Sequence, residues 1–516
     1  MLNTSRSGLR RFARNKAGNV AILFGLAIIP IILGVGVAVD YGRALSVRSR
    51  MADAADAAAL AVGSWTDLSS AEIQTKAQQF FNANYPASSL GTASAVNVSV
   101  VGNDITVKVT GVVPTTFMKL ANINSVNVGA SSTVTKKQRK IELALVLDTT
   151  GSMDSGGKMT SLKSAAKKMV QTLFKGNKSD VKIAVVPFSG AVNVGTDNEN
   201  ADWIDDGSYP NMSNIAKEDH DFDNGDNAFD LIKDMKGRQS WSGCVRERGG
   251  SYELTDDAPV PGSYETLFAP YFAPDEPDSG GYANNYIDDG NCGVSGGGWG
   301  GGWGGGSNDP ETCQSYTGKY YNEKPSGGGP DYNCPENAIT ALTSNQGQVI
   351  SAIETLDPKG NTVIPAGLLW GWRALSPGEP FTEGSAYDSE KWVKAIVLLT
   401  DGENSISGGS NGHNGSRYNA FGYPDPYRGS GHLGDKDGDD AEEELDAKTL
   451  KVCTAIKAKG IQVYTIGFKI YDDKTKAMLA SCATKTDMAY LSPTNSQLAG
   501  IFDSIAQGLS DLRIAQ

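Results

Sequence analysis

One run of twenty residues without a charge constrains the fold of this chain more than any other feature. It spans residues 20–39 and reads VAILFGLAIIPIILGVGVAV. A helix of this length crosses the hydrocarbon core of a bilayer, so the run predicts one transmembrane helix. Basic residues and no acidic residue precede it, which favours a cytoplasmic N-terminus and an exported remainder. A cleaved secretory signal is the alternative, but its apolar core is usually shorter, so we expect a retained anchor.

The chain beyond the apolar run predicts a longer helix and then a small β-rich segment. Residues 40–63 contain no proline and many good helix formers, so we expect the helix to extend to about Gly63. Residues 66–90 have a helical pattern, and residues 96–135 alternate Val and Thr at period two between turn residues. The expected divisions are therefore 1–63, a basic tail with the membrane helix, and 64–138, a helix with a β-rich linker module.

From residue 140 onward, short apolar runs alternate with helical patterns. Continuous apolar runs that end in a polar residue are typical of strands buried on both faces. The expected strands are 141–148, 181–188, 394–401 and 461–468, and the expected helices are 158–174, 336–355, 364–375, 441–458 and 495–512. Regular alternation of this kind predicts an α/β domain over residues 139–516, with a doubly wound, mostly parallel sheet.

Two insertions interrupt this alternation, at about 190–335 and about 404–440. The first is too long for one structureless loop, so we expect a disulfide-stapled subdomain or a partly disordered segment. It contains GGGWGGGWGGG with Trp299 and Trp303. Those tryptophans could form a contact patch, but their glycine-rich setting favours disorder.

The chain has six cysteines, and no two of them form a C-x-x-C pair. An even number at wide spacing suits disulfides in an oxidising compartment, and six unrelated thiols are the alternative. Cys453 and Cys482 flank the last expected long strand, and a disulfide between them is our expectation.

Three expected strand and helix ends carry side chains with oxygen ligands. They occur in LVLDTTGSM, in GNT before a helix, and in LLTDG. Ligands of open α/β sheets bind at the carboxyl ends of the strands, where these loops converge. Two carboxylates and three hydroxyls suit a hard divalent cation, Mg²⁺ or Mn²⁺. The alternative is that the first aspartate only caps a helix. The candidate ligands are Asp148, Thr150, Ser152, Thr362 and Asp401.

Residues 140–190 and 336–512 resemble the von Willebrand factor A domain with its metal-ion-dependent adhesion site. The family motif D-x-S-x-S appears here as D-T-T-G-S, with Thr150 in place of the first serine. The resemblance implies that the five candidate residues hold the cation directly or through water. It also implies that an acidic residue of a partner protein completes the metal shell.

Residues 17–63 resemble the N-terminal module of TadE/TadG-like proteins of the tight-adherence (Flp) pilus system. The shared features are a glycine before the apolar run, Asp-Tyr at its end and an Ala/Asp repeat. Pilin-like members carry a glutamate five residues after the processing glycine, and Leu23 occupies that position when counted from Gly18. We therefore expect the anchor to be kept. The resemblance implies pilus-assembly partners, a single pass of the bacterial inner membrane and a periplasmic bulk.

Several other functions fit the sequence less well. The net charge of −13 argues against nucleic acid as a partner. The strand-end motifs contain no histidine and no nucleophile–base pair, so we expect no enzyme, with a hydrolase hidden in residues 190–335 as the rival. DKDGDDAEEELD, from Asp435 to Asp446, has calcium-loop spacing but Asp440 where glycine is required, and DFDNGDNAFD at 221–230 is similar. Both segments favour solvated acidic loops over Ca²⁺ sites. The expected function is pilus assembly by metal-dependent capture of a carboxylate, and a released or displayed surface adhesin is the alternative.

Overall fold

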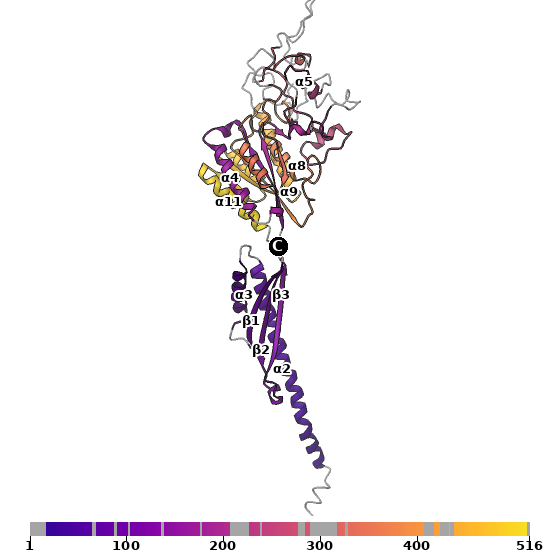
Figure 1. Cartoon of the computed structure of the whole chain (residues 1–516), viewed down its shortest axis with the longest axis vertical. Helices are drawn as coiled ribbons and strands as arrows, with labels where there is room; N and C mark the ends of the chain where they lie inside the picture. Colours follow the sequence, from indigo (N-terminus) through magenta and orange to yellow (C-terminus); the bar gives the residue numbers. More distant parts are fainter. Residues whose placement is uncertain are drawn as a thin grey trace, which may run out of the picture. The chain divides into compact units, whose positions relative to one another are not determined.

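The computed structural model of the chain divides into two compact units. One comprises residues 1–138 with 514–516, and the other comprises residues 139–513. Both units are drawn in Figure 1. The structure describes residues 17–63, 69–86, 90–101, 104–135, 139–175, 178–206, 227–237, 240–276, 284–288, 317–325, 329–406, 417–423, 433 and 438–512.

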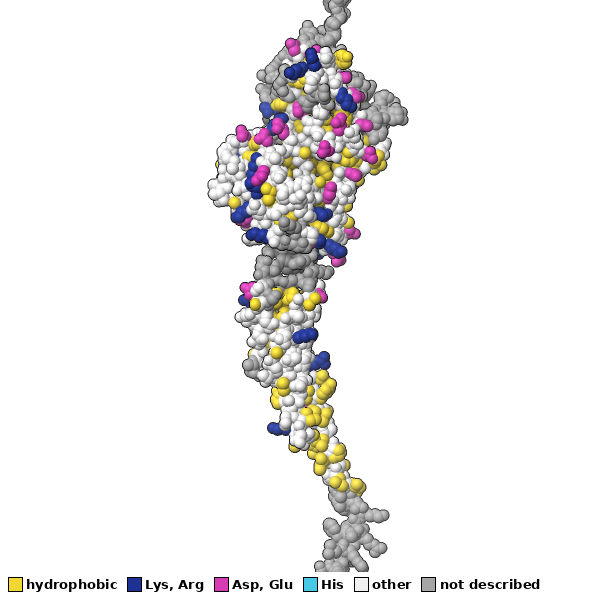
Figure 2. Space-filling view, in the orientation of Figure 1, with side chains coloured by type: hydrophobic (Ala, Val, Ile, Leu, Met, Phe, Trp, Pro, Cys, Tyr) yellow, Lys and Arg dark blue, Asp and Glu magenta, His cyan; other side chains and the backbone are white. Residues whose placement is uncertain are grey.

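The N-terminal unit is built on one long helix, α2 (Ala17–Gly63). It ends where the helix formers predicted, and it is the one helix among the described residues that is apolar and long enough to cross a membrane. Apolar side chains of its first half are exposed, and yellow side chains cover that half in Figure 2. From Gly36 onward the helix buries one face at spacings of three and four residues, the period of a helix side. The buried residues are Gly36, Asp40, Ala44, Val47, Met51, Ala54, Ala55, Ala58, Ala59, Val62 and Gly63.

A three-stranded antiparallel sheet packs on that buried helix face. Its strands are β1 (Thr92–Val101), β2 (Asp104–Pro114) and β3 (Ser125–Thr135), in the order β1-β2-β3. Burial alternates along β2, and Ile105, Val107 and Val109 share a core with α2. Helix α3 (Ser70–Asn84) completes this core with Phe81. The expected helix and β-rich segment are both present, and α2, α3 and the sheet form one unit.

The C-terminal unit contains a mostly parallel sheet, in the order β11-β10-β9-β4-β5-β8. Within the described residues, β8 runs antiparallel to β5, and the other neighbouring strands run parallel. The expected mostly parallel sheet is therefore confirmed. The strands are β4 (Lys140–Asp148), β5 (Val181–Phe188), β8 (Thr340–Thr343), β9 (Trp392–Thr400), β10 (Gln462–Phe468) and β11 (Ala489–Ser492).

Helices cover both faces of this sheet. Along the central strand β4, Leu143 and Leu145 contribute to one core, and Ala144 and Val146 contribute to the other, because successive side chains of a strand point to opposite faces. The first core includes residues of α4 (Lys158–Leu173), α7 (Gln346–Thr355) and α11 (Asn495–Leu512). The second includes residues of α8 (Ile364–Leu375), α9 (Gly438–Ala458) and α10 (Asp473–Cys482).

Three elements differ from the sequence-based expectation. Residues 336–355 are not one helix, because Thr340–Thr343 form the edge strand β8 and α7 begins only at Gln346. The Asn345 side chain accepts hydrogen bonds from the N–H groups of Gly347 and Gln348 and so caps that helix. Helix α10 and strand β11 were not predicted. β11 has four residues and lies at the sheet edge, where pairing depends on its neighbour rather than on its own apolar pattern.

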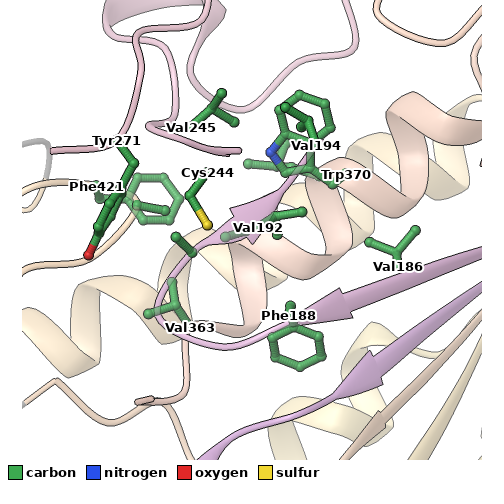
Figure 3. Packing of buried hydrophobic residues seen from close by; sticks show 14 of the residues in the cluster. Val186, Phe188, Val192, Val194, Cys244, Val245, Tyr271, Val363, Trp370 and Phe421 are labelled. Atoms are coloured by element: carbon green, nitrogen blue, oxygen red, sulfur yellow. The ribbon is translucent and has the colours of Figure 1, made fainter. Parts of the chain in front are cut away.

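The described part of the first insertion is packed against the α8 face of the sheet. The short strands β6 (Val192–Asn193) and β7 (Cys244–Val245) pair antiparallel, and the short helix α5 spans Ala228–Asp234. Figure 3 shows residues of β5, the insertion and α8 together in this cluster. Large aromatic side chains of the insertion are buried in it, namely Trp203, Trp241, Phe268, Tyr271, Phe272, Tyr286 and Tyr320. The described part of the insertion therefore shares the core on the α8 face of the sheet and belongs to the same compact unit.

Several sequence-based expectations fall on residues outside this description. Trp299 and Trp303, and residues 221–226 of the first acidic stretch, lie outside the described residues. Asp435 lies outside them too, but α9 already begins at Gly438 and includes Asp446. The twelve-residue calcium-loop spacing is therefore mostly occupied by a helix, and Asp446 accepts a hydrogen bond from Asn404.

Candidate metal centre

The candidate centre begins at the carboxyl end of β4. Asp148 is the last residue of this strand and is fully buried. Its Oδ1 accepts the backbone N–H of Thr150 at 2.8 Å, and its Oδ2 accepts the Thr400 hydroxyl at 2.7 Å. β4 and β9 are parallel neighbours, so their carboxyl ends meet at the same sheet edge. The Asp148 carboxylate thus joins the loops that follow the two strands.

Two hydroxyls connect Asp148's loop to Asp401. Thr150 Oγ1 lies 2.9 Å from Ser152 Oγ, and Ser152 donates to Asp401 Oδ1 at 2.6 Å. The 3₁₀ turn of Gly151–Asp154 turns the chain so that Ser152 faces the same way as Thr150. Asp401 also donates its backbone N–H to Asp148 Oδ2 at 3.4 Å. Four of the five predicted residues therefore lie in one hydrogen-bonded network.

Thr362 reaches the same sheet edge through backbone contacts. Gly151 donates to the carbonyl of Gly360 at 3.0 Å, and Lys359 donates to the carbonyl of Thr149 at 2.7 Å. Thr362 is 5% exposed and pairs with Ser405, which follows the β9 end. Among the described residues, no hydrogen bond joins the Thr362 hydroxyl to the other four candidates. The structure thus brings Thr362 to the loops of this network but not into its hydrogen bonds.

Gly360 allows this close approach of the loops. Its φ of +84° lies in the left-handed region that favours glycine, and a Cβ there would lie 3.1 Å from both the Asn333 carbonyl and the Ser189 hydroxyl. The neighbouring Ser189 hydroxyl donates to that same Asn333 carbonyl at 3.0 Å. A larger residue at position 360 would therefore push the loop that carries Thr362 away from Gly151.

Lys158 belongs to the network, and sequence reasoning missed it. Its Nζ lies 2.6 Å from Asp401 Oδ2, and the Asp401 side chain has no exposed surface. Lys158 is the first residue of α4, where a cation is unfavourable beside the positive end of the helix dipole. A lysine at such a position needs a nearby carboxylate, and that is the signal that could have found it.

The charge balance at the centre remains negative. Burial and the nearby Asp401 carboxylate raise the pKa of Asp148 from 3.8 to about 6, because burial disfavours any charge and Asp401 disfavours a second negative charge beside its own. The centre thus holds two carboxylates and the ammonium of Lys158. Among the described residues there is no group of three or more His, Cys, Asp or Glu side chains that could hold a metal ion. The donors available here are the two aspartates and hydroxyl oxygens.

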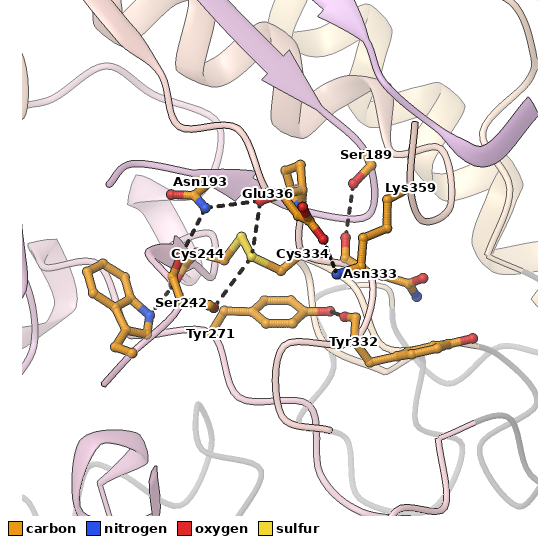
Figure 4. Close-up of a disulfide and its surroundings, with 12 residues drawn as sticks. Ser189, Asn193, Ser242, Cys244, Tyr271, Tyr332, Asn333, Cys334, Glu336 and Lys359 are labelled. Carbon is orange, nitrogen blue, oxygen red and sulfur yellow. Dashed lines mark hydrogen bonds and ion pairs between the residues drawn. A yellow bond between two sulfur atoms is a disulfide. The ribbon is translucent and has the colours of Figure 1, made fainter. Parts of the chain in front are cut away.

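A disulfide lies close to the loops of the candidate centre. Cys244 of β7 is bonded to Cys334, beside Asn333 (Figure 4). Asn193 donates from Nδ2 to the carbonyls of Ser242 and Pro335, both at 3.0 Å, and so connects the two sides of the disulfide. The disulfide and this amide hold the end of the insertion against Ser189, Gly360 and the candidate centre.

A second disulfide lies away from the centre. It joins Cys453 of α9 to Cys482 at the end of α10. Both cysteines are fully buried in the core on the α8 face. This bond ties the helix that precedes β10 to the helix that follows it.

Comparison with known proteins adds a family for the first segment of the chain. The family described as Flp pilus-assembly TadE/G-like matches residues 18–65. These residues include almost all of α2, and the C-terminal unit lies outside the match. No curated protein matches the chain.

Solved structures that resemble the chain include proteins of bacterial pili. The pilus adhesin SpaC of Lactobacillus rhamnosus GG is 13% identical, with a TM-score of 0.35, over 82% of this chain and 34% of that one. The chain therefore spans about a third of SpaC. The vWF domain of the type V pili tip protein Mfa5 of Porphyromonas gingivalis is 11% identical, with a TM-score of 0.34, over 73% and 97% of the two chains. The PilB minor pilin of Streptococcus sanguinis is 13% identical, with a TM-score of 0.32, over 82% and 79%.

Proposed function

We propose that this chain is a membrane-anchored Tad/Flp pilus-assembly protein whose C-terminal unit is a von Willebrand factor A-type domain that binds a divalent cation. The cation would be Mg²⁺ or Mn²⁺, held by Asp148, Thr150, Ser152, Thr362 and Asp401. The bound cation would accept a carboxylate from a partner protein of the pilus machinery. α2 would anchor the chain in the inner membrane, with the C-terminal unit in the periplasm.

The hydrogen-bonded network at the end of β4 carries the metal proposal. Asp148, Thr150, Ser152 and Asp401 come from the loops after two neighbouring parallel strands and lie in one hydrogen-bonded network. Their oxygens are the ligands that hard divalent cations prefer. Two buried carboxylates with one ammonium leave excess negative charge, and burial together with the Asp401 carboxylate raises the pKa of Asp148. A divalent cation would neutralise that excess, so the residues present fit it.

A binding role fits this centre better than catalysis does. When bound, the cation would supply a Lewis-acid position for an oxygen ligand. The Ser152 hydroxyl donates to Asp401 and contacts the Thr150 hydroxyl, and the sequence motif has no histidine beside them. The family match at residues 18–65 supports the pilus-assembly context and the anchoring helix.

Cation titration tests this proposal. The full chain in detergent micelles would be titrated with MgCl₂ and MnCl₂ by calorimetry, beside Asp148→Asn. We expect saturable binding by the wild-type protein and none by the variant. Asp503→Asn is the matched control, because Asp503 is a partly exposed carboxylate on α11 that pairs with Lys168. A folded wild-type chain that binds neither metal would contradict the proposed metal site.

One observation favours a second candidate function, that of a metal-dependent surface adhesin. The described part of the insertion has buried aromatic side chains and the Cys244–Cys334 disulfide, which suits an oxidising environment such as the cell surface. Cell fractionation separates the two candidates. A full-length chain retained in the membrane supports pilus assembly, whereas a shortened chain at the cell surface or in the medium supports the adhesin.

A further inference from the structure

An apolar turn of the N-terminal sheet lies beside the apolar half of α2. This turn joins β2 to β3, spans residues 115–124 and contains the 3₁₀ helix η1 (Met118–Ala121). Phe117 and Ile123 are partly exposed, and Leu120 is 73% exposed. In the described part of the N-terminal unit, Leu120 and Ile123 remain exposed, whereas Phe117 also contacts the helix.

Asp40 fixes the turn to the helix. Its carboxylate accepts the backbone N–H groups of Thr116, Phe117 and Met118 at 2.7–3.1 Å. Arg43 donates to the Thr116 hydroxyl at 2.7 Å. Asp40 is the first charged residue after the apolar run, so the turn is attached to the helix at the residue where that run ends.

Phe117 places the turn within the apolar run rather than beyond it. A Cβ on Gly36 would lie 2.4 Å from Phe117 Cβ, so the phenylalanine rests on the helix backbone at that glycine. Gly36 precedes Asp40 by one helical turn, a rise of about 6 Å. A bilayer core that contains about twenty apolar residues of this helix therefore reaches the level of the β2–β3 turn.

We propose that the β2–β3 turn inserts into the outer interfacial layer of the membrane that α2 crosses. The exposed Leu120 and Ile123 lie on the same turn as Phe117, which contacts the apolar run of the helix at Gly36. Tyr41, which follows Asp40 and is 58% exposed, lies at the same level, where aromatic residues are enriched in membrane proteins. Contact of Phe117 and Leu120 with lipid would fix the depth and tilt of the N-terminal unit in the membrane. The proposal rests on the proposed anchoring of α2.

Photo-crosslinking to lipid tests this contact. Benzoylphenylalanine would replace Leu120, Ile29 or Val101 in the full chain, reconstituted in vesicles of phosphatidylethanolamine and phosphatidylglycerol. Ile29 is exposed in the middle of the apolar run and reports anchoring alone. Val101 is the matched control, because it is 74% exposed but ends β1 at the opposite end of the sheet. The high exposure of the three positions means that a larger side chain does not disturb the core.

The outcomes separate the two proposals. Lipid adducts at positions 29 and 120, with none at position 101, support insertion of the β2–β3 turn into the interface. Adducts at 29 alone overturn it and leave the anchoring intact, and adducts at all three overturn it as unspecific contact. No adduct at 29 overturns the anchoring, and the turn contact fails with it.

Discussion

Lys158 Nζ lies 2.6 Å from Asp401 Oδ2, across a separation of 243 residues. Lys158 opens the helix after β4, and Asp401 follows β9. The ammonium therefore neutralises part of the charge that a divalent cation would otherwise neutralise. The Lys158 ammonium would therefore compete with a divalent cation for the Asp401 carboxylate at the proposed metal centre.

Replacing Lys158 should strengthen cation binding. In Lys158→Met, Asp401 loses its ammonium partner, and we expect the Mg²⁺ affinity to rise by about tenfold, or about 1.4 kcal/mol. Without metal, the same variant should be less stable by about 1–3 kcal/mol, because Asp401 stays buried with less compensation. Thermal unfolding with and without MgCl₂ measures both effects. Lys158→Arg, which keeps the positive charge, is the control. Weaker Mg²⁺ binding by Lys158→Met would contradict the prediction and show that the lysine supports the site.

Ser152 should matter for cation binding, whereas its neighbour Ser155 should not. Ser152 donates to Asp401 and contacts Thr150, while the exposed Ser155 hydroxyl donates only to the Ser152 carbonyl in the described contacts. Ser152→Ala should weaken Mg²⁺ binding by about 10–100-fold, the usual cost of a lost supporting interaction. Ser155→Ala removes the same kind of hydroxyl three positions further along the chain and is the matched control. Equal affinities of the two variants in calorimetry would remove Ser152 from the site.

Proton uptake by Asp148 should make cation binding depend on pH. The pKa of Asp148 is about 6, above its ordinary value of 3.8, so the metal-free fold gains stability from this group below about pH 4 and loses it as the pH rises through 6. Cation binding has the opposite sign, because the cation needs the carboxylate. Mg²⁺ affinity should be about tenfold lower at pH 5 than at pH 7. Calorimetry at the two pH values measures this ratio, and a flat profile would show that Asp148 is not a ligand.

The two described disulfides should differ in what their removal does. Cys244–Cys334 closes a loop of 90 residues and Cys453–Cys482 a loop of 29, so chain entropy predicts losses of about 4–5 and about 3–4 kcal/mol. Paired Cys→Ser variants in guanidinium unfolding measure both. Only the first pair should also weaken Mg²⁺ binding, because it holds Asn333 against Gly360 and Ser189. Weakened binding in the second pair instead would contradict this coupling.

Much of the fold could be predicted because burial leaves a periodic pattern. The apolar run and the good helix formers after it predicted α2 to Gly63, and strands buried on both faces predicted the parallel sheet. Strand β8 was missed because it is short and lies next to a helical pattern, so its pairing with β5 comes from the neighbouring strand. The same reason applies to β11 at the other edge.

Asp148 and Asp401 could be placed at the ends of strands from the residues alone, because each ends a continuous apolar run and such runs form buried strands. The contact of Lys158 with Asp401, the contact of Phe117 with Gly36 and the pairing of Cys244 with Cys334 emerged only from the folded chain. These contacts join residues far apart in the chain or on different elements, and local periodicity carries no information about such distances. They depend on how whole helices and strands pack, which is settled by burial and charge over the folded unit.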